Sequence, residues 1–376
     1  MATFPIRLDI FRTAIPMRRF EHAAARRDTA QAVVARMTFD DGSVTWGETL
    51  PRQYVTGETL DSVVRDIEET LWPWCCAERP AGELPLRTAD GRPIPAAACA
   101  IDLCDPGGLR RQRRSGRRAI AARVSGVLGS AEPARTLRRL RLMWLYGLKD
   151  FKLKLGFGEA VDGENLRLVH RLIGRPVAAG RASLRVDVNG GWDAASTPQR
   201  VAELARQGVC AVEQPVRCGA AELVELARAC NGGAGGVPLI ADESLVTEDD
   251  AQTLLAEPRR IWWNIRISKN GGLQAAGRLL ALAAEHRVSA VVGCMVGESG
   301  ILSAAQRRLL ADREAAMVRL VEGNYGRFLL SDDLTRPSPR FGYGGRLTLL
   351  SGGGLGVQVL EDKVLRYGRL VRTLEA

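Results

Sequence analysis

Short apolar segments alternate with amphipathic helical patterns from about residue 121 to residue 321. Eight segments have strand character, and a helical pattern follows each of the first seven. This alternation predicts a parallel (β/α) barrel rather than an open sheet. The expected strands are residues 122–127, 151–155, 184–188, 209–213, 238–241, 261–267, 290–294 and 317–321. The expected helices are residues 134–146, 164–172, 198–206, 221–230, 249–256, 273–286 and 302–311.

Before the barrel, the pattern indicates a smaller unit of mixed α and β structure. Residues 6–16 have an extended pattern. Residues 31–39 and 44–48 alternate apolar and polar positions around Asp40-Asp41-Gly42-Ser43, which is a hairpin signal. Apolar residues at helical spacing then predict a helix over residues 60–72.

Three other stretches complete the expected organisation. Residues 18–29 are polar and turn-like, and we expect them to form a mobile flap. Residues 77–118 are poorly patterned and end in an arginine-rich run at 110–118, which predicts a solvated linker or helix face. Residues 341–376 are glycine-rich and then extended, and we expect them to return to the N-terminal unit. The expected parts are a capping domain at 1–118, a barrel at 119–335 and a returning segment at 336–376.

The composition is that of a soluble globular protein, with 46% apolar and 26% charged residues among 376. No stretch approaches 18 uninterrupted apolar residues, so a membrane span is not expected. The first 12 residues lack the pattern of a signal peptide, which predicts a cytoplasmic protein. The eight cysteines contain no C-x-x-C pair, and this argues against a disulfide framework and against a thiolate zinc site.

The net charge of +10 comes mainly from arginine, because only five of the 53 cationic residues are lysines. A basic chain can bind nucleic acid, but the run at 110–118 lacks interleaved aromatic or glycine residues. We therefore expect no nucleic-acid partner. The rare lysines are more informative, because a desolvated lysine can lose its proton and an arginine cannot. They are Lys149, Lys152, Lys154, Lys269 and Lys363.

Charged and polar side chains gather at the ends of the predicted barrel strands. Barrel enzymes carry their chemistry at the carboxyl ends of the strands. The successive charged positions from Lys154 to Glu298 are 26 to 33 residues apart, which is about one strand–helix unit. This spacing predicts a ring of side chains around the barrel mouth. The ring contains Lys152, Lys154, Asp187, Asn189, Glu213, Asp242, Lys269 and Glu298.

Three acidic residues of this ring, Asp187, Glu213 and Asp242, end three successive strands. Converging carboxylates repel one another unless a cation lies between them. Ligands that are oxygen only favour a hard cation, and therefore Mg²⁺ or Mn²⁺ over zinc. We expect these three residues to hold the metal.

Lysines flank the expected metal site on both sides. Lys152 and Lys154 are two residues apart on one strand and face the same side, and Lys269 comes from four strands further on. Desolvation, a metal ion and a second ammonium all favour the neutral form of a lysine. One neutral lysine could remove a proton α to a carboxylate while the metal stabilises the enediolate, and the other could return a proton on the opposite face.

Together these motifs resemble the enolase superfamily, in its muconate-lactonizing-enzyme subgroup. The resemblance extends over nearly the whole chain. It includes Trp46-Gly47-Glu48 in the N-terminal unit and Gly293-Cys294-Met295 in the seventh strand. The barrel motifs are Lys152-Leu-Lys154, Asp187-Val-Asn189, Glu213-Gln-Pro215, Asp242-Glu243-Ser244 and Asn264-Ile-Arg-Ile-Ser-Lys269-Asn-Gly-Gly272.

The resemblance implies an α/β fold, a modified (β/α)₇β TIM-like barrel with an α+β capping domain. A lysine or histidine base working with Mg²⁺ is the general pattern of this superfamily. The resemblance therefore implies Lys154 and Lys269 as paired bases, with Lys152 assisting. None of His22, His170 and His286 lies on the seventh strand, which favours the two-lysine subgroup. The substrate would contact Asn189, Glu298, Glu322 and, on the flap, Phe20 and His22.

The resemblance further implies a small-molecule carboxylate substrate and a homo-oligomer. We expect racemisation or epimerisation of an amino-acid derivative or another carboxylate. Cycloisomerisation or β-elimination through the same enediolate is the alternative, and a barrel without turnover is also compatible with the sequence. Leu320-Val321-Glu322 has one acid where dipeptide epimerases usually carry Asp-x-Asp, which argues against a dipeptide.

Overall fold

The computed structural model describes residues 4–22, 25–77, 83–105, 120–230, 236–311 and 317–376, with the side chains of residues 19–27 outside this description. The arginine-rich run at 110–118 also lies outside the described residues. Among the residues that are described, no helix is both long and apolar enough to cross a bilayer.

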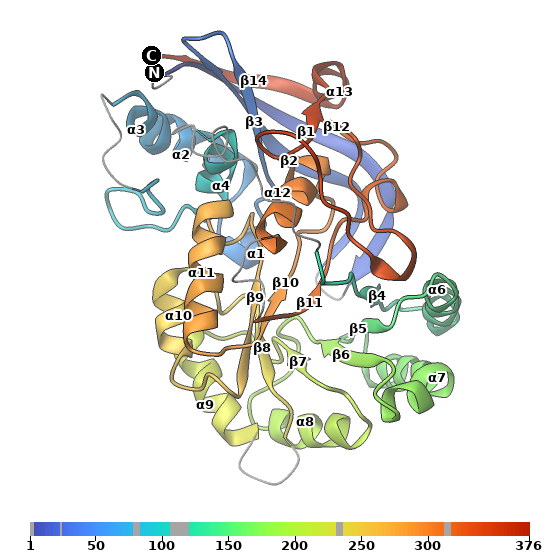
Figure 1. The fold of residues 1–376 in the computed structure, drawn as a ribbon. Coiled ribbons are helices and arrows are strands. Elements are labelled where there is room, and N and C mark those ends of the chain that lie inside the picture. Colours follow the sequence, from blue (N-terminus) through green and yellow to red (C-terminus); the bar gives the residue numbers. More distant parts are fainter. Residues whose placement is uncertain (1–3, 23–24, 78–82, 106–119, 231–235, 312–316) are drawn as a thin grey trace.

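A closed eight-stranded parallel barrel forms the larger part of the molecule (Figure 1). The strands follow chain order, and Val124 pairs with Val321, which joins the first strand to the last. The predicted α/β barrel is therefore confirmed. The strands are β4 (Gly126–Leu128), β5 (Asp150–Lys154), β6 (Ser183–Asp187), β7 (Val212–Glu213), β8 (Leu239–Ala241), β9 (Ile261–Ile265), β10 (Ala290–Val292) and β11 (Val318–Val321).

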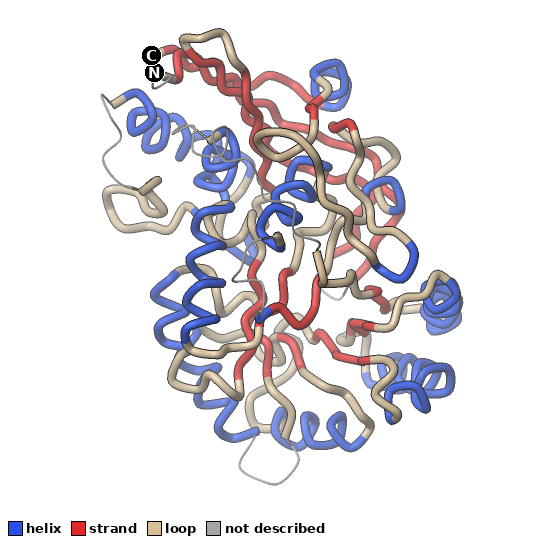
Figure 2. Tube along the Cα trace, viewed as in Figure 1, coloured by secondary structure: helices blue, strands red, loops and turns tan. Residues whose placement is uncertain are grey.

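Helices cover the outside of the barrel, as the outer blue coils around the red strands show in Figure 2. Each of the first seven strands is followed by a helix, and β11 is followed by the short 3₁₀ helix η3 (Gly326–Phe328). This order is the (β/α)₇β arrangement. The helices are α6 (Pro133–Leu145), α7 (Glu159–Ala178), α8 (Thr197–Arg206), α9 (Ala220–Cys230), α10 (Glu248–Leu254), α11 (Leu273–Glu285) and α12 (Gly300–Leu310).

An antiparallel sheet lies above the barrel and joins the two ends of the chain (Figure 1). Its order is β14-β1-β2-β3, with β1 at Pro5–His22, β2 at Ala25–Phe39, β3 at Val44–Thr49 and β14 at Gly368–Glu375. The expected hairpin at 40–43 joins β2 to β3, and Gly42 there adopts a φ of 77°, which glycine reaches without strain.

The expectation of a turn-like flap at residues 18–29 was wrong for the backbone. Strands β1 and β2 continue through this region, and their pairing extends to Phe20 with Arg27 and to His22 with Ala25. The polar composition suggested a turn, but the backbone pairing of β1 with β2 continues through these polar residues.

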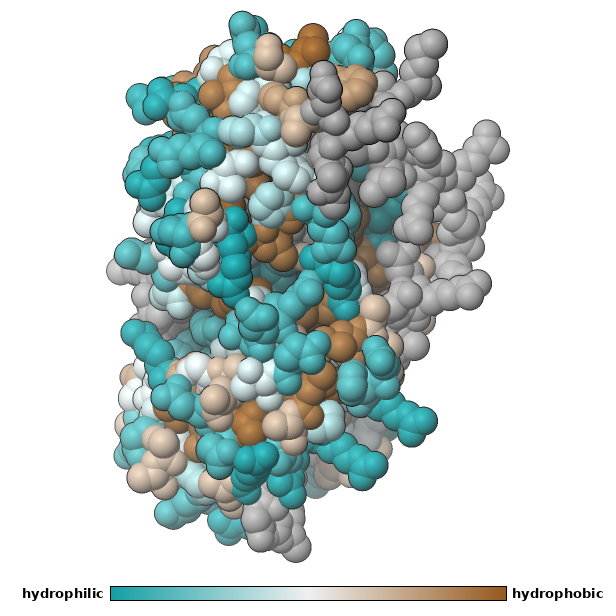
Figure 3. Space-filling model, turned by 90° about the vertical axis from the view of Figure 1, so that its left-hand side faces the viewer, coloured by the Kyte–Doolittle hydropathy of each residue, from teal (hydrophilic) through white to brown (hydrophobic). Residues whose placement is uncertain are grey.

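The remaining elements are short and surround this sheet. On the N-terminal side they are α1 (Gln53–Thr56), α2 (Leu60–Asp66), the π-helix η1 (Ile67–Leu71), α3 (Trp72–Cys76) and α4 (Pro95–Cys104). After the barrel come β12 (Thr335–Arg336), η4 (Tyr343–Gly345), β13 (Gln358–Val359) and α13 (Glu361–Tyr367). The face in Figure 3 carries hydrophilic side chains with smaller apolar groups between them.

Alternation along the barrel strands separates an apolar layer from a polar one. The inner apolar layer contains Ala211, Ile240, Val291 and Leu320, with Trp262 packed against them. Because side chains of a strand alternate between faces, the residues two positions further on also point inward. They are Glu213, Asp242, Asn264, Gly293 and Glu322, and they form the polar layer on which the site is built.

Buried polar contacts hold the capping sheet against the mouth of the barrel. The Glu48 carboxylate accepts hydrogen bonds from Ser299 N (3.0 Å), Ser299 Oγ (2.7 Å) and Leu302 N (3.1 Å) at the start of α12. Ser268 Oγ lies 2.9 Å from Thr49 Oγ1. These contacts fix β3 over the carboxyl ends of the barrel strands.

Candidate active site

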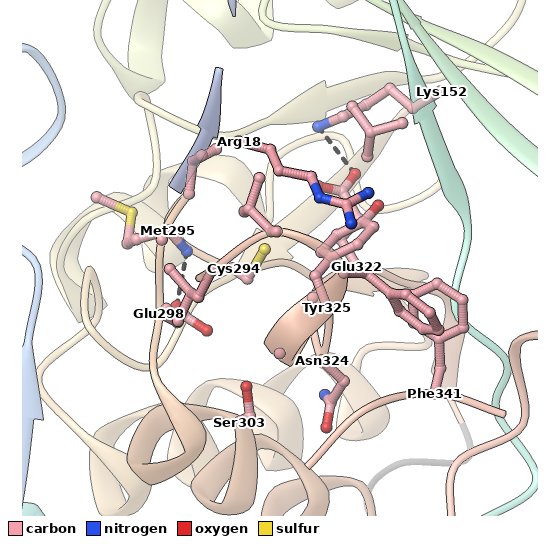
Figure 4. Close-up of a pocket in the computed structure, with 18 of the residues that line it drawn as sticks. Arg18, Lys152, Cys294, Met295, Glu298, Ser303, Glu322, Asn324, Tyr325 and Phe341 are labelled. Carbon is pink, nitrogen blue, oxygen red and sulfur yellow. Dashed lines mark hydrogen bonds and ion pairs between the residues drawn. The ribbon is translucent and has the colours of Figure 1, made fainter. Parts of the chain in front are cut away.

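A cavity of about 470 Å³ lies at the barrel mouth beneath the capping sheet. Its floor includes the polar side chains of Lys152, Lys154 and Arg266, and Arg18 of β1 enters from the cap (Figure 4). One wall is aromatic and apolar. That wall includes Leu142, Met143, Tyr146, Tyr325, Phe328 and Phe341.

Both lysines of β5 point into the barrel and contact acids. Lys154 Nζ lies 3.1 Å from Asp187 Oδ2 and donates to Asn189 Oδ1 at 2.9 Å. Lys152 Nζ lies 3.1 Å from Glu213 Oε1 and 3.2 Å from Asp187 Oδ2. Burial by itself lowers the pKa of Lys152, but Glu213, Glu322 and Asp187 together raise it well above its ordinary value. Lys152 therefore stays an ammonium.

Asp187, Glu213 and Asp242 are fully buried just beneath these cations. Burial acts to raise the pKa of Asp187, but Lys154 and Lys152 lower it below its ordinary value. Burial raises the pKa of Glu213 to about 7, against the effect of Lys152. The structure thus brings the three predicted carboxylates to one end of the barrel.

Arg266, which sequence reasoning missed, occupies the floor on the β9 side. Its Nη2 contacts Asp242 Oδ2 and lies 3.6 Å from Glu213 Oε1. Burial lowers the pKa of the guanidinium, but Asp242 and Glu213 raise it well above its ordinary value. Arg266 comes two residues after the inward-facing Asn264, so extending the strand alternation one step beyond β9 could have identified it.

Lys269 does not reach the cavity. It lies in the turn after β9, where its ammonium is fully buried and donates to Asp242 O (2.6 Å), Asn264 O (2.7 Å) and Asp242 Oδ1 (3.1 Å). The sequence suggested that Lys269 would face Lys154 across the mouth. The turn instead directs the side chain behind Asp242, because strand alternation ends with the strand.

Glu322 was expected to contact substrate, but its carboxylate is engaged inside the barrel. Oε1 lies 2.8 Å from Lys152 Nζ and also pairs with the buried Arg185. Burial raises the pKa of Glu322, but Lys152 and Arg185 bring it below its ordinary value. Figure 4 shows Glu322 beside Lys152 at the edge of the cavity.

The other predicted substrate contacts differ in position. Asn189 and Glu298 both line the cavity. Glu298 Oε1 accepts a hydrogen bond from Met295 N at 2.6 Å, and burial raises its pKa to about 8. Phe20 and His22 lie on β1, but their side chains are outside the described residues.

The carboxylate oxygens of this site are donors that suit a divalent metal, but their side chains as they stand do not converge on one point. In the described part of the chain, no three His, Cys, Asp or Glu side chains converge as they stand to hold a metal. Lys152, Lys154 and Arg266 lie against the carboxylates instead. The donors are all carboxylate oxygens, and the buried Asp187 Oδ2 lies between the ammonium groups of Lys154 and Lys152, at 3.1 and 3.2 Å. This chemistry fits Mg²⁺ or Mn²⁺ once Arg266 moves from Asp242.

The chain belongs to the enolase C-terminal domain-like family, whose model matches residues 134–363. The L-Ala-D/L-Glu epimerase of Bacillus subtilis is 28% identical over 314 residues, covering 80% of this chain and 83% of the epimerase. Muconate cycloisomerase 1-1 of Acinetobacter lwoffii is 31% identical over 259 residues, covering 68% of this chain and 64% of that enzyme.

The solved structures agree with this family in their fold. The crystal structure of the N-succinyl Arg/Lys racemase from Bacillus cereus superposes with a TM-score of 0.82 at 23% identity, covering 99% of both chains. This likeness extends the shared fold through the capping sheet as well as the barrel.

Proposed function

We propose that this protein is an isomerase that removes a proton α to a carboxylate and passes through an enediolate. Lys154 is the base. The observation that carries this proposal is its position: Lys154 Nζ borders the cavity, while Asp187 and Asn189 hold it at 3.1 and 2.9 Å. Membership of a family with epimerases, racemases and cycloisomerases among its relatives supports the same first step.

Lys152 assists Lys154 through its positive charge. Its ammonium is held by three carboxylates and lies two residues before Lys154 on the same face of β5. The same charge stabilises negative charge that develops on substrate oxygens. Lys152 therefore acts electrostatically, while Lys154 carries the proton.

Asp187, Glu213 and Asp242 would hold a Mg²⁺ ion, with Mn²⁺ as a substitute. When bound, the metal supplies a Lewis acid that lowers the energy of the enediolate. Glu243 borders the cavity next to these residues, and its Oε2 has no hydrogen-bond partner. It is a further oxygen donor for the metal or its water.

Two reaction outcomes share this first step. Racemisation or epimerisation is the outcome expected from the sequence, and the epimerase and racemase relatives support it. Cycloisomerisation or β-elimination is the second candidate. The position of Lys269 favours it, since that lysine is fully buried and is not among the residues that line the cavity.

The substrate that fits is a small carboxylate with an apolar portion and no free ammonium group. The cavity wall contributed by Tyr325, Phe328 and Phe341 suits an apolar group. Glu322, the acid at the eighth strand end, is already neutralised by Lys152 and Arg185. An N-acylated amino acid fits these features better than a dipeptide. A cytoplasmic homo-oligomer remains part of the proposal.

Proton exchange in D₂O tests this function. We expect loss of the α-proton signal, in the presence of MgCl₂, for at least one compound among N-succinylarginine, L-Ala-L-Glu and muconolactone. The exchange should need both Mg²⁺ and Lys154. An enzyme that binds Mg²⁺ but exchanges no α-proton in a wider screen of N-acyl amino acids would contradict the proposal.

A further inference from the structure

The cavity at the barrel mouth continues outward to the helix α6. The residues of this helix that line it are three and four positions apart, so they share one side of the helix. They are Arg139, Leu142, Met143 and, directly after the helix, Tyr146. In Figure 4, Tyr325 lies between Glu322 and Phe341, at the boundary between the charged floor and this outer part. We call the outer part the outer lobe, which is lined by Leu142, Met143, Tyr146, Tyr325, Phe328 and Phe341.

Aromatic rings of the outer lobe contact one another edge to face. The centroid of the Tyr146 ring lies 5.9 Å from that of Phe328 and 6.0 Å from that of Phe341, with interplanar angles of 78° and 76°. Phe341 also lies 5.5 Å from Tyr325, at 83°. Aromatic pairs are stabilised by such tilted contacts beyond the burial of apolar area. The four rings therefore hold each other in fixed orientations.

The segment after the barrel fixes this aromatic wall from outside. Gly344 N donates to the carbonyl oxygen of Tyr146 at 2.8 Å, and the Tyr343 ring lies 5.8 Å from that of Tyr146. Gly147 has a φ of 86°, and a Cβ there would lie 2.9 Å from Cζ of Tyr343. The absence of a side chain at Gly147 thus allows Tyr343 to pack against the end of α6. The wall is built into the fold before any ligand arrives.

The outer lobe offers apolar surface and little hydrogen bonding. The hydroxyl of Tyr325 donates to the carbonyl oxygen of Ser125 at 3.2 Å, so Tyr325 contributes its ring to the lobe. Leu142 and Phe328 are 63% and 38% exposed although they line the cavity. The lobe is therefore open to water at these two residues. An apolar group bound there would cover surface that is now hydrated, which is favourable.

We propose that the outer lobe binds an aromatic ring that the substrate carries at a distance from its reacting carboxylate. This inference rests on the proposed function, which places the carboxylate at the charged floor beside Lys154, and it narrows the substrate class to carboxylates with an aryl group. The cavity volume of about 470 Å³ falls within the range of about 300–1,000 Å³ that encloses ligands of drug size. A ring in the lobe can make the same edge-to-face contacts as the rings already present, which an aliphatic chain cannot.

Three matched compounds test this preference. N-acetylalanine has the carboxylate and the amide with no ring. N-acetylphenylalanine adds a phenyl ring to its side chain, and N-benzoylalanine adds one to its acyl group. Calorimetry with the wild-type protein in MgCl₂ measures the affinity for both enantiomers of each compound. We expect at least one aryl compound to bind at least tenfold more tightly than N-acetylalanine.

Two leucines of α6 provide a matched pair of variants. Leu142 lines the lobe, whereas Leu145, which is 74% exposed, is not among the described residues that line the cavity. Both side chains are exposed, so a glutamate at either position is compatible with the fold. Leu142→Glu places a carboxylate at the opening of the lobe and should reduce the aryl preference at least fivefold. Leu145→Glu should leave the preference unchanged. Because all three compounds are anions of equal charge, their affinity ratio cancels the general effect of the added charge.

The binding data and the exchange data separate the two proposals. An aryl preference that Leu142→Glu removes, without α-proton exchange for any compound in D₂O, would support the outer lobe and count only against the proposed function. Exchange of N-acetylalanine together with equal affinities for all three compounds would count only against the outer lobe. An aryl preference that persists in Leu142→Glu, or no binding of either aryl compound by the wild type, would also overturn this inference.

Discussion

Lys152 Nζ lies 2.8 Å from Oε1 of Glu322, so the acid at the eighth strand end serves an internal ion pair. The same oxygen pairs with Arg185 from β6. The three side chains link β5, β6 and β11 beneath the cavity. Their charges are buried, and removing one partner leaves the others uncompensated.

We expect Glu322→Gln to lower the free energy of unfolding by about 3 kcal/mol, because it breaks a buried ion pair and leaves two cations. Urea denaturation measures this change. Glu298→Gln is the matched control, since Glu298 lines the same cavity but its raised pKa makes it largely neutral at pH 7. Equal stabilities of the two variants would show that Glu322 is not the anchor of this network.

We expect Lys154→Met to slow α-proton exchange about 10³-fold, which is the usual contribution of a general base. The exchange rate in D₂O measures this loss, and near-UV circular dichroism checks that the fold is retained. Lys363→Met provides the control, because Lys363 pairs with Asp332 away from the cavity. Exchange at the wild-type rate in Lys154→Met would remove this lysine from the chemistry.

We expect Lys269→Met to act first on stability. The substitution leaves the carbonyl oxygens of Asp242 and Asn264 without their buried donor, which should cost about 3 kcal/mol of unfolding free energy. Thermal and urea denaturation test this. If the variant keeps full stability but loses exchange, Lys269 takes part in proton transfer and our placement of it is wrong.

Metal binding should respond in opposite directions to two substitutions. Asp187→Asn should weaken Mg²⁺ binding, because it removes a charged ligand. Arg266→Gln should tighten it about tenfold, or ~1.4 kcal/mol, because the guanidinium competes for Asp242 and Glu213. Calorimetry with MgCl₂ measures both affinities. Weaker binding in Arg266→Gln would exclude such competition.

Stability should fall as the pH rises from about 5 to 8. Burial raises the pKa of Glu298 from 4.5 to about 8, so between these values the folded state binds more protons than the unfolded state. The unfolding free energy therefore decreases with rising pH. Burial also raises the pKa values of Glu48 and Glu58 to about 7, and both groups contribute in the same direction. We expect a shallower slope in Glu298→Gln when urea denaturation is repeated across this range. Identical slopes would mean that Glu298 is ionised in the folded protein.

The sequence by itself determined the barrel and most of its polar floor. Hydrophobic periodicity located the eight strands, and alternation within β5 placed Lys152 and Lys154 on one face, because a strand repeats every two residues. The steps of 26 to 29 residues between Asp187, Glu213 and Asp242 brought these acids to the same end of the barrel.

Only the tertiary structure decided where the side chain of Lys269 points. Strand alternation carried one step beyond Ile265 still places Arg266 on the cavity floor, but the turn that follows was free to direct Lys269 behind Asp242. The partners of Glu322 were hidden for a related reason: Lys152 and Arg185 lie 170 and 137 residues away along the chain, and only closure of the barrel brings the three charges together.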